Sequence, residues 1–383
     1  MTRLLTFSLI LWLIPAAAQN KPRARDLGIP FDGDPGPLNA ITDVAGVEVG
    51  HVTLISGSGP LAVGSGPVRT GVTAILPRGK DSKDPVFAAW FAQNGNGEMT
   101  GTPWVEESGF LEGPVMITNT HSVGVVRDAV VGWMARNGKL FQSFAMPVVA
   151  ETFDGYLNDV NGFHVKETHA VEAITKARSG PVAEGNVGGG TGMICMEFKG
   201  GFGTASRAVS IGGNQYTLGI AVQANYGRRP QLLIAGAPVG KEIADGVPRR
   251  AANPLTGTEA GSIIIIAATD APLVAHQLKR IARRITMGLA RTGSTAGNGS
   301  GDIFLAFSTA NPGAASANPL AEVRMLANGQ LNPLFEATVQ ATEEAIVNAL
   351  VAAETMTGVN GRTVVALPHD RLREVLRKYN RLR

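Results

Sequence analysis

Cysteine and charge are both scarce in this sequence, and each shortage excludes a class of protein. With a single cysteine, Cys195, no disulfide can form within the chain. Only 17% of the 383 residues are charged, the formal net charge is +3, and no basic stretch carries interleaved aromatic residues. Nucleic acid is therefore not an expected partner. The six histidines are scattered without a metal-ligand spacing such as HExxH, so we predict neither a metal site nor a cofactor.

Long apolar runs are also lacking. Residues 4–14 are apolar, but this run is too short to span a bilayer. It follows Arg3 and precedes the small residues 15–18, which is the order of a secretory signal peptide. We predict that residues 1–18 are removed and that the mature protein is periplasmic or secreted, without a membrane partner. An N-terminal membrane anchor is the alternative.

The sequence contains many alternating strand and helix patterns. The predicted strands are residues 47–54, 70–76, 115–118, 146–151, 193–198, 204–211, 215–224, 231–235, 303–308 and 362–366, with one more in the isoleucine run after residue 262; the predicted helices are residues 121–137, part of 161–179, 272–292, 333–357 and 370–382. The strands form two sets with helices outside them, which predicts two sheets flanked by helices. Because no long linker divides the pattern, we predict one domain over residues 19–383.

The dipeptide Gly261-Ser262 is the strongest functional signal. Residues 245–260 are rich in Gly, Pro, Asn, Thr and charge, which is typical of an exposed loop, and residues 263–266 are four isoleucines. If the bond before Ser262 is cut, this residue gains a free α-amine beside its own hydroxyl, and the amine can serve as a local base. The pattern therefore fits an N-terminal-nucleophile hydrolase. Taken alone, it also fits an ordinary junction between a loop and a strand.

Further polar residues stand at the ends of predicted strands. Ser300 and Asp302 alternate at the entrance of the strand 303–308, so we expect both on one face, directed toward the nucleophile. Asn225 ends another strand and is a candidate donor to an oxyanion. Glu151 ends the apolar strand 146–151 and is a candidate partner for a substrate ammonium group. For each of these taken alone, an ordinary turn or strand end is the favoured interpretation.

Together these segments resemble the DmpA-type aminopeptidases, a family of L-aminopeptidase/D-esterases and β-peptidyl aminopeptidases. The resemblance extends over nearly all of the mature chain. Its segments, in collinear order, are residues 23–33, 39–51, 71–79, 94–109 (NGNGEMTGTPWVEESG), 114–124, 147–163 (PVVAETFDGYLNDVNGF), 185–193 (GNVGGGTGM), 198–207 (FKGGFGTASR), 222–227 (VQANYG), 234–240, 261–273 (GSIIIIAATDAPL), 277–284 and 300–311 (SGDIFLAFSTAN).

The resemblance implies an α/β fold, an αββα four-layer sandwich like that of N-terminal-nucleophile hydrolases but with a different connectivity, shared with ornithine acetyltransferases. It also implies self-cleavage into an α-chain of residues 19–261 and a β-chain of residues 262–383. The implied site has Ser262 as the nucleophile, supported by Ser300 and Asp302, with Asn225 in the oxyanion hole. Glu151 would anchor the free amine of the substrate. By family resemblance the enzyme is also a homo-oligomer, a tetramer of αβ heterodimers, without a cofactor.

The resemblance places Phe153 and Trp104 in the substrate pocket. Some members carry Tyr where this chain has Phe153, and a phenylalanine cannot donate a hydrogen bond to an oxyanion. We therefore expect a secreted or periplasmic serine aminopeptidase acting on small peptides, amides and esters. The preference among α-L, D- and β-amino acids stays open. The alternatives are an acyltransferase related to ornithine acetyltransferase and a catalytically silent periplasmic protein of the same fold.

Overall fold

The computed structural model describes residues 21–248, 261–316 and 318–382. Its larger sheet has six strands in the order β4-β3-β12-β11-β10-β9. These strands are β3 (Val86–Ala92), β4 (Phe110–Leu111), β9 (Gly201–Ile211), β10 (Asn214–Asn225), β11 (Gly261–Thr269) and β12 (Ser300–Ser308). Every neighbouring pair is antiparallel except β11 and β12, which are parallel. A parallel pair needs a crossover, and helix α5 (Ala275–Arg291) supplies it.

The smaller sheet has four strands in the order β1-β2-β5-β6. These are β1 (Glu48–Ser56), β2 (Val68–Leu76), β5 (Val115–Asn119) and β6 (Val148–Thr152). The parallel pair β5 and β6 is joined through helix α2 (Val123–Arg136), so each sheet contains one parallel pair with its own crossover helix.

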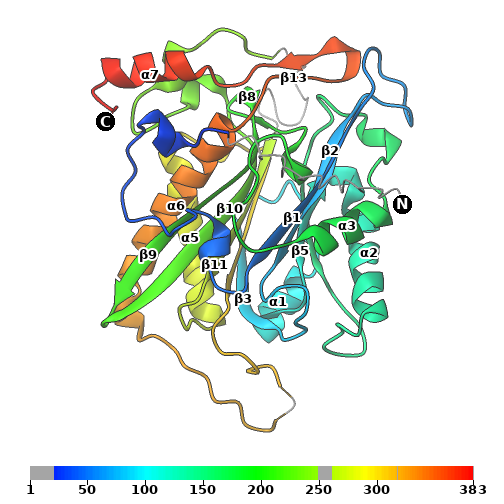
Figure 1. Ribbon diagram of the computed structural model, residues 1–383, viewed down its shortest axis with the longest axis vertical. Coiled ribbons are helices and arrows are strands. Elements are labelled where there is room, and N and C mark those ends of the chain that lie inside the picture. Colours follow the sequence, from blue (N-terminus) through cyan, green and yellow to red (C-terminus); the bar gives the residue numbers. More distant parts are fainter. Residues whose placement is uncertain (1–20, 249–260, 317, 383) are drawn as a thin grey trace, which may run out of the picture.

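Helices cover the outer face of each sheet (Figure 1). Helix α6 (Asn332–Val351) lies beside α5 over the six-stranded sheet, and α3 (Glu167–Lys176) lies with α2 over the four-stranded sheet. Three separate apolar cores fill the three interfaces between these layers. The predicted αββα four-layer sandwich is confirmed.

Close contact between α6 and its neighbours depends on small residues. A Cβ on Gly288 of α5 would lie 2.5 Å from the Cβ of Thr342 on α6, and a Cβ on Gly203 of β9 would lie 2.1 Å from the carbonyl oxygen of Ala345. Real Cβ atoms do not approach other atoms so closely, so these glycines let the helix pack directly against α5 and the sheet. Ala345 and Ala349 of α6 are the residues that lie against Gly203, so small residues on both elements permit the close packing.

Several local predictions were wrong. Residues 193–198 do not form one strand, because Met196 and Glu197 have φ values of +50° and +59°; they turn the chain between β7 (Ile194–Cys195) and β8 (Phe198–Lys199). Residues 231–235 form no strand either. A 3-10 helix (Arg229–Gln231) and an isolated bridge occupy that stretch.

The remaining elements are short. They are helices α1 (Thr102–Ser108), α4 (Val239–Glu242) and α7 (His369–Lys378), and strands β13 (Met356–Thr357) and β14 (Thr363–Val364). Strand β3 and helix α1 were not predicted, and the predicted strand 362–366 shrinks to β14. The predicted helix 333–357 ends at Val351, where α6 ends.

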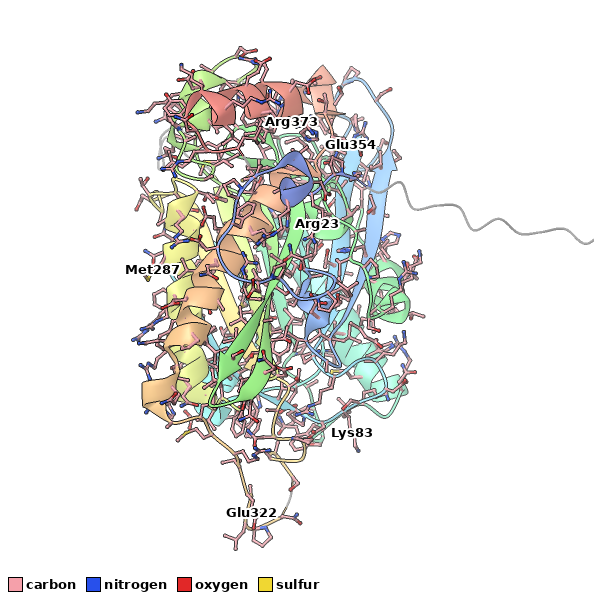
Figure 2. The ribbon with its side chains drawn as sticks, turned by 60° about the vertical axis from the view of Figure 1, so that its left-hand side comes forward. Arg23, Lys83, Met287, Glu322, Glu354 and Arg373 are labelled. Carbon is pink, nitrogen blue, oxygen red and sulfur yellow. The ribbon has the colours of Figure 1, made fainter. Side chains whose placement is uncertain are left out.

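Two predicted features lie outside the described residues: the signal peptide 1–18 and most of the loop before Gly261. In the described ranges, no helix is long and apolar enough to cross a membrane. The segment that joins β12 to α6 extends away from the layered body, and Glu322 lies on it (Figure 2). It exposes the apolar side chains of Leu320, Val323 and Met325.

Candidate active site

Ser262 is the second residue of β11, in the middle of the six-stranded sheet, and is 5% exposed. In the register of the sheet it lies opposite Asn225 of β10 on one side and Gly301 of β12 on the other. Residues directly opposite in an antiparallel pair, as Ser262 and Asn225 are, have Cβ atoms about 4.5–5.5 Å apart. The backbone N–H of Gly301 also donates to Ser262 Oγ at 3.3 Å. The predicted nucleophile and the predicted oxyanion donor are therefore neighbours.

Both ends of the Asn225 side-chain amide are fixed. Its Oδ1 accepts a hydrogen bond from the backbone N–H of Ile194 at 2.8 Å, and its Nδ2 donates to the carbonyl oxygen of Phe153 at 3.0 Å. An amide nitrogen carries two hydrogens, so Nδ2 keeps a second one for another acceptor. The arrangement holds the amide in one orientation beside Ser262.

Gly97 lies between Glu151 and Gly301, the residue opposite Ser262 in the sheet. A Cβ on Gly301 would lie 2.4 Å from the carbonyl oxygen of Asn96, so the chain at residues 96–97 closes directly over β12. A Cβ on Gly97 would lie 3.1 Å from Gly301 Cα and 3.2 Å from Glu151 Oε1. Glu151 is thus separated from the residue beside Ser262 by a single glycine.

Glu151 is 3% exposed, and its carboxylate lacks a cationic partner among the described residues. Thr120 Oγ1 donates to its Oε2, and the backbone N–H of Glu98 donates to its Oε1 at 3.1 Å. Burial raises the pKa of Glu151, while these two hydrogen bonds lower it. A buried carboxylate with neutral donors can still accept an ammonium group. The sequence had not pointed to Thr120 or Glu98, because both contacts arise from the fold.

Ser300 and Asp302 are buried next to each other, and the Ser300 hydroxyl donates to Asp302 Oδ1. They share one face of β12, as predicted, but it is not the face of Ser262. Phe304, two residues beyond Asp302, belongs to the core under α5 and α6, whereas Ile264, two residues beyond Ser262, belongs to the core between the sheets. The expected direction toward the nucleophile is therefore wrong in this uncut chain.

The register explains what Ser300 does contact. It lies opposite Gly261, the residue before the predicted cleavage point, and Asp302 lies opposite Ile263. The Ser300–Asp302 pair is consequently positioned beside the backbone that surrounds the Gly261-Ser262 bond, where a cut would leave the α-amine of Ser262.

The two residues predicted for the pocket differ in their placement. Phe153 is 48% exposed, and its carbonyl oxygen contacts Asn225, so it borders the site. Trp104 lies on α1, and its indole Nε1 donates to Glu112 at 2.9 Å. Thr100, just before α1, donates a hydrogen bond to the carbonyl oxygen of Pro147, which precedes the first residue of β6. Glu151 is near the last residue of the same strand. Trp104 thus lies toward the other end of β6, and its pocket role stays a prediction.

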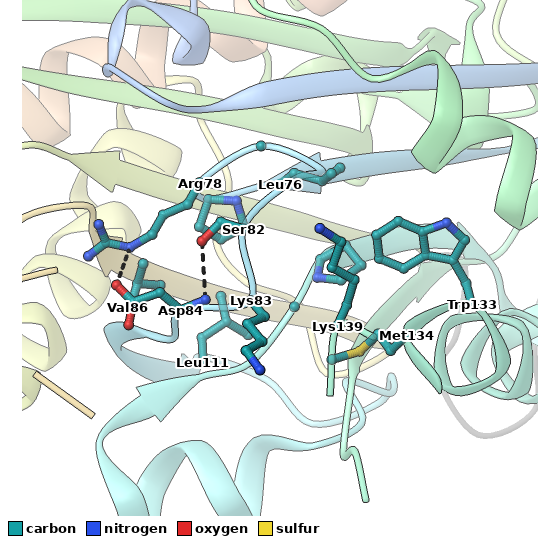
Figure 3. A pocket seen from close by; sticks show the side chains of 14 residues that line it. Leu76, Arg78, Ser82, Lys83, Asp84, Val86, Leu111, Trp133, Met134 and Lys139 are labelled. Carbon is teal, nitrogen blue, oxygen red and sulfur yellow. Dashed lines mark hydrogen bonds and ion pairs between the residues drawn. The ribbon is translucent and has the colours of Figure 1, made fainter. Parts of the chain in front are cut away.

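A separate small cavity lies away from this cluster, between the end of β2 and helix α2 (Figure 3). It measures about 20 Å³, room for one water, and is lined by Arg78, Trp133 and Lys139 among others. Its Arg78 pairs with Asp84 at 3.5 Å. Such a cavity has no space for a peptide.

The four-layer fold, with a serine at the head of a central strand, is of the type found in N-terminal-nucleophile hydrolases. The chain belongs to peptidase family S58, whose model matches residues 39–364. It is 59% identical to the β-peptidyl aminopeptidase BapA of Sphingosinicella microcystinivorans, over 97% of this chain and 96% of that protein. Identity with the BapA of Sphingosinicella xenopeptidilytica is 50%, over 97% and 94%.

A solved structure supports the same assignment. The L-aminopeptidase D-Ala-esterase/amidase of Ochrobactrum anthropi, a serine aminopeptidase with a variant of the Ntn hydrolase fold, superposes with a TM-score of 0.88 at 50% identity. The match covers 95% of this chain and 100% of that one. The protein is therefore an aminopeptidase, and the predicted family resemblance is confirmed.

Proposed function

We propose that this aminopeptidase processes itself before Ser262 and then uses that residue to release N-terminal amino acids from small peptides, amides and esters. The observation that carries the proposal is the register of β10 and β11, which sets Ser262 directly beside Asn225. The buried, cation-free Glu151 nearby supports a substrate with a free amine. No cofactor takes part in this scheme.

Self-processing would begin when Ser262 Oγ attacks the carbonyl carbon of Gly261. The peptide C–N bond breaks, an ester forms on Oγ, and the nitrogen of Ser262 takes the proton that the hydroxyl gave up. Water then hydrolyses the ester and leaves residues 262–383 with a free α-amine. Ser300 and Asp302, beside Gly261 in the register, are placed to accept hydrogen bonds from this amine and hold it.

In peptide hydrolysis the neutral α-amine of Ser262 accepts the Oγ proton as the oxygen attacks the substrate carbonyl. Negative charge develops on the carbonyl oxygen, and the free hydrogen on Asn225 Nδ2 is the donor placed to stabilise it. The C–N bond then breaks and the leaving amine takes the proton. Water attacks the resulting acyl-Ser262 ester, again with the α-amine as base, and releases the amino acid.

The named relatives differ in their substrates: one is a β-peptidyl aminopeptidase and the other is an L-aminopeptidase D-Ala-esterase/amidase. We propose that β-amino acids are among the residues this chain removes, because its identity with the β-peptidyl enzyme of Sphingosinicella microcystinivorans, 59%, exceeds the 50% that it shares with the L-aminopeptidase D-Ala-esterase/amidase. Phe153 borders the site and offers no hydroxyl, so the side-chain donor to the oxyanion is Asn225 alone in this proposal.

Two further parts of the proposal concern the context of the enzyme. Export to the periplasm or the outside is supported by the order of residues 1–18, a basic residue followed by an apolar run and small residues. Assembly into a homo-oligomer is supported by the projecting segment, whose Leu320 is 86% exposed.

Substitution of Glu151 by glutamine tests the requirement for a free amine. A charged hydrogen bond in a desolvated site contributes about 1.5–3 kcal/mol, so we expect kcat/KM to fall on the order of tenfold to a hundredfold. The wild-type enzyme should cleave free-amine dipeptides and aminoacyl anilides and leave their N-acetylated forms intact. Steady-state kinetics on matched pairs of substrates provides the measurement.

Glu98→Gln is the matched control, because the hydrogen bond from Glu98 to Glu151 comes from its backbone N–H, and its exposed side chain acts on the Glu151 carboxylate only through repulsion between the two charges. Its kcat/KM should stay close to the wild-type value. Equal turnover of acetylated and free substrates would contradict the proposed role of Glu151.

A further inference from the structure

Lys199 is a fully buried lysine close to the active site. It ends strand β8, is 0% exposed, and pairs with no carboxylate among the residues that the structure describes. Its Nζ donates instead to the carbonyl oxygens of Met193 at 2.9 Å and Gly200 at 2.8 Å, and lies 3.5 Å from that of Gly190. Burial lowers the pKa of Lys199 to about 7, while acceptors of this kind favour the charged form.

The carbonyl of Met193 belongs to the same peptide group as the N–H of Ile194. That N–H donates to Asn225 Oδ1, and Asn225 Nδ2 donates in turn to Phe153. Hydrogen bonds in series polarise one another, so a positive charge on the carbonyl side makes the N–H a stronger donor. The same effect continues through the side-chain amide of Asn225 and makes its Nδ2 hydrogens more positive.

We propose that Lys199 is a positioning residue for the oxyanion donor: through the Met193–Ile194 peptide it orients Asn225 and strengthens the hydrogen bond that Asn225 gives to the substrate oxygen. The inference rests on the proposed function, because it requires Asn225 to stabilise the developing negative charge. The competing interpretation is purely structural: Lys199 ties the turn between β7 and β8 to Gly200 and has no effect on the reaction beyond stability.

The two roles separate in a double-variant cycle on the full chain. Lys199→Met keeps the length and apolar stem of the side chain and removes the charge. We expect kcat for a free-amine anilide to fall about tenfold with KM within twofold of the wild-type value. In the Asn225→Ala background the same substitution should cause almost no further loss of kcat, because the group through which Lys199 acts is gone.

Arg69→Met is the matched control. Arg69 is also a buried cation bonded to backbone carbonyls, those of Ser56, Gly57, Val68 and Thr357, but none of its acceptors contacts Asn225. This variant should lower the midpoint of thermal unfolding and leave kcat close to the wild-type value. Thermal unfolding of every variant is followed alongside its kinetics.

Three outcomes would overturn the proposal: an unchanged kcat in a folded Lys199→Met enzyme, a rise in KM in place of the fall in kcat, or losses that multiply in the double variant. If Lys199→Met does not fold, Lys199→Gln is put through the same cycle, and failure of both to fold assigns the residue to the structure alone. An inactive wild-type enzyme would refute the proposed function itself, and the Lys199 inference with it.

Discussion

Ser262→Ala is expected to leave a single uncut chain that hydrolyses no free-amine substrate at a useful rate. Without the hydroxyl, neither the attack on Gly261 nor the attack on a substrate carbonyl can take place. Loss of a nucleophile of this kind lowers kcat on the order of 10⁴-fold or more. Denaturing electrophoresis of the purified protein and steady-state kinetics give the two measurements.

Ser308→Ala provides the control. Ser308 ends the neighbouring strand β12, at the end far from Ser262, and its hydroxyl donates to the carbonyl oxygen of Ala271 at 2.6 Å. This variant should still be cut and should still hydrolyse substrate.

A serine-directed covalent inhibitor should label residues 262–383 of the wild-type enzyme. If purified Ser262→Ala protein still splits before residue 262, an external protease makes the cut and the self-processing proposal is wrong.

Asn225→Ala is expected to have the second-largest effect on turnover. Removal of one oxyanion donor costs about 10²–10³ in kcat, and the proposed scheme has no second side-chain donor to compensate for it. Because the contact forms in the transition state, KM should change little. The kinetics should be measured on fully processed protein, so that any slower maturation does not appear as lost activity.

Gln223→Ala is the matched control for Asn225. Gln223 lies two residues earlier on the same face of β10, is equally buried, and its amide donates to Thr118 and Thr152. We expect a comparable loss of stability with nearly unchanged kcat. If both variants lose the same factor in kcat, the effect of Asn225 is structural and its role as an oxyanion donor is refuted.

The layers of the fold could be predicted because the apolar residues of each strand and helix recur with the period of that element along the chain. Residues 263–266 and 303–307 are apolar on both faces, as expected of central strands covered on both sides, and the long helices follow a spacing of about 3.6 residues. The turn at Met196 and Glu197 could not be predicted this way. Neither residue type favours a positive φ, so tertiary contacts impose that conformation.

The site was predictable in part for the same reason. The alternation that puts Ser300 and Asp302 on one face is a property of one strand, and the prediction of a shared face was right. Which face it is depends on the offset between β11 and β12, and the offset is set by how both strands pack against helices and the opposite sheet. Lys199 lay beyond prediction because a lysine in a Gly-rich stretch normally indicates an exposed turn.

The strand order of the larger sheet has a consequence for the cut enzyme. Strands β11 and β12 come from the part of the chain after residue 260, and they lie between β3 on one side and β10 on the other, both from the part before it. Cleavage before Ser262 would therefore yield two interleaved polypeptides joined along two seams of backbone hydrogen bonds. Their separation would require the backbone hydrogen bonds between β3 and β12 and those between β10 and β11 to break. Unfolding would then release two chains, and recovery would become a second-order encounter that slows on dilution, whereas the uncut precursor refolds at a rate independent of concentration.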